Sequence, residues 1–261
     1  MAADMMYTAL AGINTFNTAL TVVSDNISNA NTTAFKSGTV EFGDLVSGLI
    51  STPNAANATA QGAGSTVLAV STDFSTGSQE VETGTWSDLM IQGNGFFSVY
   101  NPTSKDTSYT RDGEFQVNAS GDLTDENGNE VLDSKGDPIT GIDPATYSSF
   151  SVDQYGDVIG TTSSGNTTID TIGVTTFSND NGLVRVGSND YTEGANVGTV
   201  TLGAAGSGQA GTITAGALEG SNVDLTQQMV DLIDYQADYQ ACSKAITTGN
   251  NDLQTVVNLI H

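Results

Sequence analysis

The chain has 261 residues and is strongly acidic, with 30 Asp and Glu against 6 Lys and Arg and a formal net charge of −24. Such a chain repels nucleic acid and anionic membrane surfaces, so we expect neither as a partner. Its single cysteine, Cys242, excludes an intrachain disulfide and a four-cysteine zinc site, and a single histidine at the last position, His261, argues against a Cys/His or Ser/His catalytic pair.

The first predicted element is a long helix from Asp4 to Thr33. Large apolar residues recur every seven positions with a second column three places behind them, a spacing typical of a helix that packs along another helix. Gly12 lies inside this helix at a cost of about 1 kcal/mol relative to Ala, so the helix should depend on packing. A core helix of a globular domain is the alternative. The residues expected in the seam are Met6, Ile13, Phe16, Leu20, Val23 and Ile27.

The middle of the chain has a different period. Short apolar runs such as Phe96–Tyr100 alternate with turn pairs such as Asp112-Gly113 and Ser120-Gly121, which is the rhythm of a β-meander. We therefore predict a β-rich outer region at 67–202. The flanking ranges 39–66 and 203–221 are rich in Gly, Ala, Ser and Thr and predict connectors, with a short helix or strand left open for Glu41–Ile50.

A second long helix is predicted for Asn222–His261, about 55 Å in length at 1.5 Å per residue. A helix of that length needs a partner, and the N-terminal seam is the expected one. The predicted fold class is α+β: an all-β central region, meander or barrel-like, flanked by terminal helices (1–38 with 222–261) that pair as a coiled coil. The seam residues expected in this helix are Leu225, Met229, Leu232, Tyr239, Ile246, Leu253 and Ile260.

No catalytic, cofactor-binding or metal site is predicted. Asp125, Asn127 and Asn129 superficially suggest a calcium loop, but Glu130 stands where that loop needs Gly, so a β-turn is the better interpretation. No apolar run reaches about 18 residues, so we expect no membrane span. The N-terminus lacks the pattern of a cleaved signal peptide, which predicts either a cytosolic chain or export without cleavage.

Four sequence blocks resemble the bacterial flagellar rod and hook protein family. They are Leu20–Phe42, Leu89–Val99, Tyr109–Leu123 and Gly216–Leu225, in the family's order. The family usually has Gly before its Phe-Lys pair, where this chain has Ala34, so the need for a positive φ at that position is open. The residues that match the family signature are Asn26, Asn29, Asn31, Phe35, Lys36, Gly95, Phe96, Phe97, Arg111, Gly113 and Asn222.

The resemblance implies a self-assembling axial subunit of the flagellum and not an enzyme, with no cofactor. It implies a homopolymeric tube, contacts with other axial proteins (rod, hook cap and hook–filament junction), and uncleaved export through the flagellar type III apparatus. The block Val256–Ile260 resembles the hook protein, whereas the length is nearer that of the distal rod protein. Our main hypothesis is a short, extracellular hook subunit that transmits torque from rod to filament. The alternatives are a periplasmic distal rod subunit, acting as a straight drive shaft, and a secreted β-rich adhesin or enzyme.

Overall fold

The computed structural model describes residues 2–47, 61–77 and 80–260. The chain is α+β and divides into two compact units. One, which we call the helical unit, comprises Met1–Ala30, Ser37–Asp73 and Val223–His261. The other, which we call the β unit, comprises Asn31–Lys36 and Phe74–Asn222. The short segment Asn31–Lys36 thus belongs to the β unit although helical-unit segments flank it on both sides.

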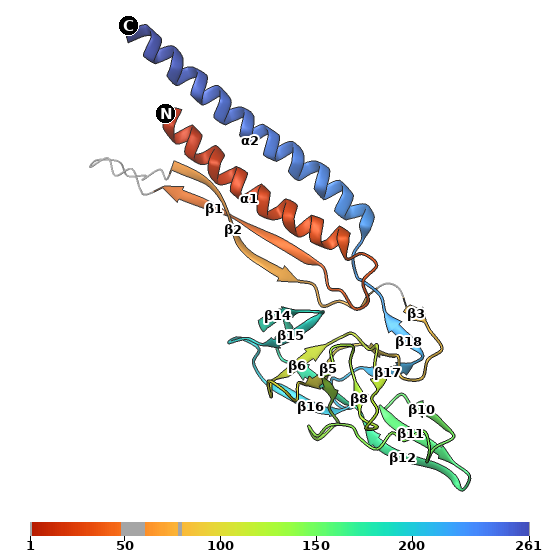
Figure 1. Cartoon of the computed structure of the whole chain (residues 1–261). Coiled ribbons are helices and arrows are strands. Elements are labelled where there is room, and N and C mark those ends of the chain that lie inside the picture. Colours follow the sequence, from red (N-terminus) through yellow and green to blue (C-terminus); the bar gives the residue numbers. More distant parts are fainter. Residues whose placement is uncertain (1, 48–60, 78–79, 261) are drawn as a thin grey trace. The chain divides into compact units, whose positions relative to one another are not determined.

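The helical unit consists of two antiparallel helices and a β-hairpin (Figure 1). Helix α1 spans Ala2–Ser28 and helix α2 spans Leu225–Ile260, so both predicted helices are present. The side chain of Asp224 caps α2, because its Oδ1 accepts the backbone N–H groups of Thr226 (2.9 Å) and Gln227 (3.2 Å). Helix α2 has 36 residues against 27 in α1, and its last turns extend beyond the N-terminus of α1.

The expected connector 39–66 contains strands instead. Strand β1 (Gly38–Ser47) pairs antiparallel with β2 (Gln61–Thr72), and residues 48–60 of that connector lie outside the described residues. The small residues of β2 allow a close approach to α1: a Cβ on Gly64 would lie 2.9 Å from Cβ of Ala11 and 3.1 Å from the carbonyl oxygen of Thr8. A composition that suggests a loose connector therefore reflects a strand lying close against a helix.

The β unit is built from short antiparallel strands. Its largest sheet has the order β14-β15-β6-β5-β9-β8-β7, with β13 pairing with β5 and β16. A three-stranded sheet β10-β11-β12 and the pairs β17-β4 and β18-β3 complete the described pairing, in which no sheet closes on itself. The strands are β3 Glu80–Glu82, β4 Leu89–Gln92, β5 Phe96–Tyr100, β6 Thr107–Thr110, β7 Gln116–Val117, β8 Leu123–Thr124, β9 Glu130–Val131, β10 Ser149–Val152, β11 Asp157–Thr162, β12 Gly165–Thr171, β13 Gly173–Phe177, β14 Leu183–Gly187, β15 Asp190–Glu193, β16 Val200–Ala204, β17 Thr212–Ala215 and β18 Ala217–Glu219, with a 3₁₀ turn at Asp180–Gly182.

The second expected connector, 203–221, also contains strands, since β17, β18 and the end of β16 fall within it. Its glycines again mark places where two segments of backbone come close together. A Cβ on Gly211 would lie 2.4 Å from the carbonyl oxygen of Gln92, the last residue of β4, with which β17 pairs. Ile213 of β17 is buried in the core. Small residues in 203–221 make room for backbone pairing between strands. Composition alone does not distinguish such a paired segment from a linker.

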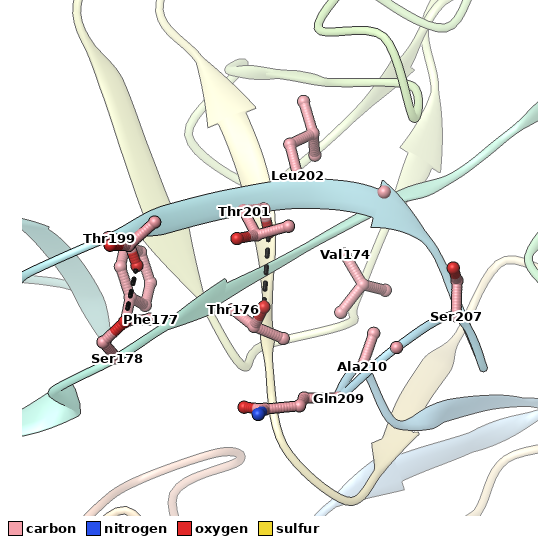
Figure 2. A pocket seen from close by; sticks show the side chains of 12 residues that line it. Val174, Thr176, Phe177, Ser178, Thr199, Thr201, Leu202, Ser207, Gln209 and Ala210 are labelled. Atoms are coloured by element: carbon pink, nitrogen blue, oxygen red, sulfur yellow. Dashed lines mark hydrogen bonds between the residues drawn. The ribbon is translucent and has the colours of Figure 1, made fainter.

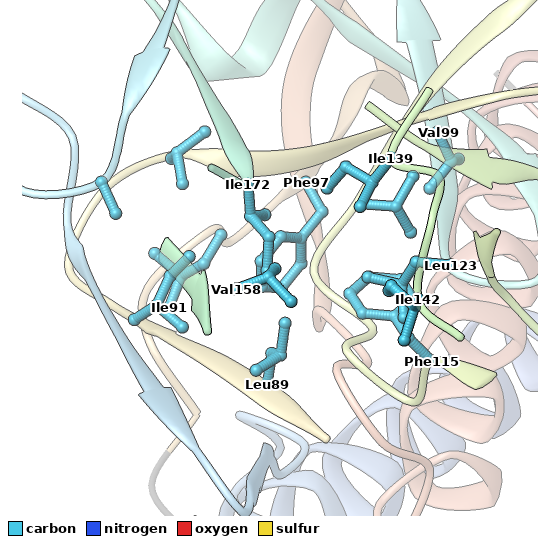
Figure 3. Close-up of a cluster of buried hydrophobic side chains, with 14 residues drawn as sticks. Leu89, Ile91, Phe97, Val99, Phe115, Leu123, Ile139, Ile142, Val158 and Ile172 are labelled. Carbon is cyan, nitrogen blue, oxygen red and sulfur yellow. The ribbon is translucent and has the colours of Figure 1, made fainter. Parts of the chain in front are cut away.

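Two clusters of buried side chains hold the β unit together. The larger draws on strands throughout the unit and includes Leu89, Phe97, Phe115 and Ile172 (Figure 3). The rings of Phe97 and Phe115 meet edge to face with centroids 5.1 Å apart. The smaller cluster is mainly aromatic and is formed by Phe96, Tyr109, Phe177, Tyr191 and Val197.

Candidate functional site

Helices α1 and α2 approach each other through small and polar residues. A Cβ on Gly12 of α1 would lie 2.8 Å from Sγ of Cys242 in α2, so the glycine leaves room for the thiol. Near the other end of α1, the buried Asn26 side chain donates to the Gln228 side chain of α2 (Nδ2 to Oε1, 2.9 Å). It also exchanges hydrogen bonds of 2.8 Å with the backbone N–H and carbonyl of Gly38. One asparagine thereby joins α1 both to α2 and to the start of the hairpin.

Aromatic rings form a third link within the helical unit. Phe16 of α1, Phe42 of β1 and Tyr235 of α2 lie with ring centroids 5.9 to 6.4 Å apart. The hydroxyl of Thr15 donates to the carbonyl oxygen of Ser65 in β2 at 2.9 Å. These contacts fix the hairpin and both helices against one another.

The predicted seam residues differ in burial. In α1, Val23 is buried while Met6, Ile13, Phe16, Leu20 and Ile27 are half-buried. In α2, Leu232 and Ile246 are half-buried, whereas Leu225, Met229, Tyr239 and Leu253 are exposed. Ile260 ends α2, and its side chain lies outside the described residues. The positions of α2 that contact α1 form another column of sevens, Gln228, Tyr235 and Cys242, continued by the buried Gly249.

Within the β unit, a buried carboxylate lies between two cations. Oε1 of Glu219 is 2.6 Å from Nζ of Lys36, and Oε2 is 3.4 Å from Nη1 of Arg111. The three side chains are 0 to 3 % exposed. Glu219 also accepts the backbone N–H of Gly77 at Oε1 (2.8 Å), and Lys36 donates to the carbonyl oxygen of Ser75 (2.7 Å). We call these three charged residues the ionic cluster.

Arg111 is held by a hydrogen bond and a cation–π contact in addition to its ion pair. Its Nη2 donates to the carbonyl oxygen of Gly93 at 2.8 Å, and its guanidinium lies 5.1 Å from the ring centre of Phe96. Burial lowers the pKa of the Arg111 guanidinium, and the neighbouring Glu219 carboxylate opposes that shift. An arginine stays charged under these conditions, so the cluster carries two positive charges and one negative charge.

The backbone at Ala34 has a positive φ, although alanine stands where the family usually has glycine. Ala34 is fully buried with a φ of 57°, so the backbone adopts the left-handed conformation that glycine prefers. Its N–H donates to the backbone carbonyl of Glu219 at 2.8 Å. The next residue, Phe35, is also fully buried, and the guanidinium of Arg185 lies 4.5 Å from its ring centre. The Phe-Lys pair is thus inserted into the β unit through a strained turn.

Five of the eleven signature residues meet at or near the ionic cluster. Besides Phe35, Lys36, Phe96 and Arg111, Asn222 takes part, since its N–H donates to the carbonyl oxygen of Phe35 at 3.3 Å. Glu219 was not among the predicted site residues. Two signature cations that are to be buried need an acid, and the fourth block, Gly216–Leu225, offers two, Glu219 and Asp224. The need for a negative charge near these cations is the signal in the sequence that points to a buried acid.

The remaining signature residues have local roles. A Cβ on Gly113 would lie 1.7 Å from the carbonyl oxygen of Leu89, so no side chain fits there. Gly95 has a φ of 122° and packs against Val174. Phe97 lies in the core. Asn29 Nδ2 donates to the Asp25 carbonyl at 2.9 Å, whereas Asn31 is exposed.

One pocket of the β unit has no titratable side chain in its lining. This pocket, drawn in Figure 2, lies between β13, β16 and the loop 207–210, and its lining carries hydroxyl, amide and apolar groups. Its hydroxyls of Thr176 and Ser178 are hydrogen-bonded to backbone carbonyls. Within the described ranges, no group of three or more His, Cys, Asp or Glu side chains is arranged to hold a metal ion. Neither described helix is long and apolar enough to cross a membrane.

Three family models match successive parts of the chain. "Flagella basal body rod protein" matches residues 6–36, "Flagellar hook protein FlgE/F/G D1 domain" matches 90–160, and "Flagellar basal body rod FlgEFG protein C-terminal" matches 214–259. The flagellar basal-body rod protein FlgG of Bacillus subtilis is 38 % identical over 267 aligned positions, covering 97 % of this chain and 98 % of the relative. The chain belongs to the flagellar rod and hook protein family. It is accordingly a structural protein of the flagellum and not an enzyme.

Within this family, rod proteins and hook proteins differ in how much of their length aligns with this chain. FlgG of Borreliella burgdorferi is 31 % identical and aligns over 97 % of both chains, so it too is covered almost completely. The flagellar hook protein FlgE of Escherichia coli is 38 % identical, but over only 46 % of this chain and 30 % of the relative. The hypothesis of a short hook protein is therefore less well supported than the rod alternative. The C-terminal family model, whose description covers FlgE, FlgF and FlgG, matches residues 214–259 and so does not separate the two kinds of protein.

A separate group of acids lines one surface depression of the β unit. Asp112, Glu114, Asp125, Glu126 and Asp190 surround it. Burial is the largest cause that raises the pKa of Asp112 to about 6, and Glu114, Glu126 and Asp125 add to it by repulsion. The pKa of Asp190 is likewise raised to about 6, first by burial and then by Asp125. Both carboxyl groups therefore bind protons more tightly in the folded than in the unfolded chain.

This predicts a stability that falls with rising pH. A raised carboxyl pKa stabilises the folded state below about pH 4 and loses that contribution as the pH rises through about 6. Asp112→Asn should remove part of this slope and stabilise the protein at pH 7 by on the order of 1 kcal/mol. Urea unfolding at pH 5 and pH 7 measures both effects. An unchanged slope in the variant contradicts the assignment, and Asp106→Asn, at an exposed position away from the depression, is the control.

The ionic cluster predicts unequal effects for two substitutions. Glu219→Gln removes the carboxylate that pairs with both buried cations, Lys36 and Arg111, and should cost about 3–5 kcal/mol of unfolding free energy. Lys36→Met leaves the oppositely charged Glu219 and Arg111 together and should cost less. Chemical denaturation of both variants tests this order. Equal losses, or a larger loss for Lys36→Met, would show that charge balance does not govern the cluster.

Proposed function

We propose that this chain is the distal rod subunit of a bacterial flagellum and polymerises into a straight tubular drive shaft. The main support is that the FlgG proteins align over nearly the whole length of both chains, whereas the hook protein aligns over less than half of either chain. A rod subunit needs no pocket and no cofactor. It needs surfaces that join copies of itself.

The helical unit supplies the assembly element in this proposal. The α1 and α2 helices pair as a coiled coil that lines the tube, using their small contact residues within one chain. The exposed seam residues of α2, Leu225, Met229, Tyr239 and Leu253, then remain for neighbouring chains. Burial of each such side chain between copies contributes about 1.5–3 kcal/mol.

The β unit and the hairpin form the outer layers. Of the 30 acidic residues, 23 lie between residues 39 and 221, so repulsion between copies is concentrated there. Salt screens such repulsion beyond about 10 Å at 0.1 M, so rod assembly is favoured by salt or divalent cations. The outer layer sets the spacing of subunits, and the helical layer supplies the apolar attraction.

The further partners follow from this role. The chain leaves the cytoplasm uncleaved through the flagellar type III export apparatus and takes its place in the basal body between other axial proteins. A hook subunit is the second candidate, favoured by the 38 % identity to the Escherichia coli hook protein over 120 positions.

Complementation distinguishes the two candidates. The gene is expressed in a Bacillus subtilis strain lacking FlgG and in an Escherichia coli strain lacking FlgE, and basal bodies are isolated for electron microscopy. We expect restored rods and motility in the first strain and no hook in the second. Hooks in the second strain without rods in the first would replace the rod proposal with the hook candidate.

The assembly surface makes a second prediction. Leu253→Asp places a charge on the exposed apolar side of α2 and should abolish polymerisation at protein concentrations at which the unchanged chain forms tubes. Asn251→Asp adds the same charge on the opposite side of the helix and should assemble normally. Sedimentation and electron microscopy measure polymer, and circular dichroism confirms that both variants stay folded. Equal assembly of the two variants would refute the seam.

A further inference from the structure

The chain passes between the helical unit and the β unit four times, at residues 30/31, 36/37, 73/74 and 222/223. On the β-unit side, these passages leave three segments: Asn31–Lys36, the stretch that begins at Phe74, and the stretch that ends at Asn222. We call these three the junction segments. They are far apart in the sequence, and any force or order passed along the backbone between the two units runs through them.

All three junction segments are fastened to one another around Glu219. Its backbone carbonyl accepts the N–H of Ala34 (2.8 Å), and its Oε1 accepts both Nζ of Lys36 (2.6 Å) and the N–H of Gly77 (2.8 Å). The first segment also contacts the second directly, because Lys36 donates to the carbonyl oxygen of Ser75 at 2.7 Å. A single residue is therefore bonded to both of the other junction segments.

The C-terminal segment completes the arrangement. Asn222 donates its backbone N–H to Phe35 (3.3 Å), and its side-chain Nδ2 lies 3.4 Å from the carbonyl oxygen of Ser75. The approach is close, since a Cβ on Gly77 would lie 1.9 Å from the carbonyl oxygen of Gly220. Arg111 then ties the Glu219 carboxylate to the loop carbonyls of the β unit through Gly93.

We propose that Glu219 makes the ordering of the three junction segments a single cooperative event, so that none of them is fully ordered without the other two. Each segment uses the same carboxylate or its partners, and a buried carboxylate deprived of Lys36 or a buried lysine deprived of Glu219 carries a large desolvation cost. Partial order is thereby penalised. Glu219 acts as a positioning residue for the passages between the units, and this role holds whether the polymer is a rod or a hook.

Hydrogen exchange of the full-length chain, followed by mass spectrometry, tests the proposal. We compare the unchanged chain with Glu219→Gln and with Lys36→Met. Each variant should raise exchange in peptides covering residues 31–36, 74–77 and 220–222 together, by roughly tenfold or more, while peptides of β5 and β13 keep their protection. The matched control is Glu82→Gln, an exposed carboxylate on the strand that pairs with β18.

The outcomes separate cooperative from independent ordering. Faster exchange confined to the peptide that carries the substitution shows three independent segments and overturns the proposal, as does an equal effect of Glu82→Gln. If Glu219→Gln raises exchange throughout the β unit, Lys36→Met decides, because it leaves Glu219 paired with Arg111. Failure of rod complementation bears on the polymer and leaves this exchange pattern untouched.

Discussion

The salt bridge between Lys36 and Glu219 is the interaction on which the arrangement of the junction segments of the β unit depends. A carboxylate with no exposed surface is costly unless cations and N–H groups surround it, and here Lys36, Arg111 and the N–H of Gly77 do so. These groups come from different parts of the sequence, so the bridge forms only when those parts are correctly brought together. An apolar cluster of the same size could stabilise the site as well. It would not demand one particular arrangement of the chain.

The helical unit follows a different rule, because its helices meet through small, polar and aromatic side chains. Gly12, Cys242 and Gly249 occupy the contact between the helices or its continuation, while several large apolar groups of α2 remain in solvent. In a single chain this arrangement leaves favourable burial unused. Interiors reach dense packing when such groups interdigitate, so the helical pair has the character of one part of a larger interior.

The sequence predicts the periodic parts of this fold well. Heptad spacing places both helices, and the run Phe96–Tyr100 coincides with strand β5. It fails where side chains are small: the hairpin and the strands within 203–221 have the composition of linkers, because closely approaching backbones leave no room for the apolar residues that reveal a strand. The signature residues were identified by resemblance, but their convergence on Glu219 depends on long-range contacts that local spacing does not contain. The left-handed φ of Ala34 likewise follows from the docking of its neighbours.

The contact between Gly12 and Cys242 gives the molecule a natural reporter. Cys242 is the only thiol in the chain, and it is partly covered by the glycine of the opposite helix. A maleimide or disulfide reagent reaches it fully only when the helices part. Its labelling rate therefore measures, without any engineered probe, how tightly the two ends of the chain are held together before and after a copy joins its neighbours.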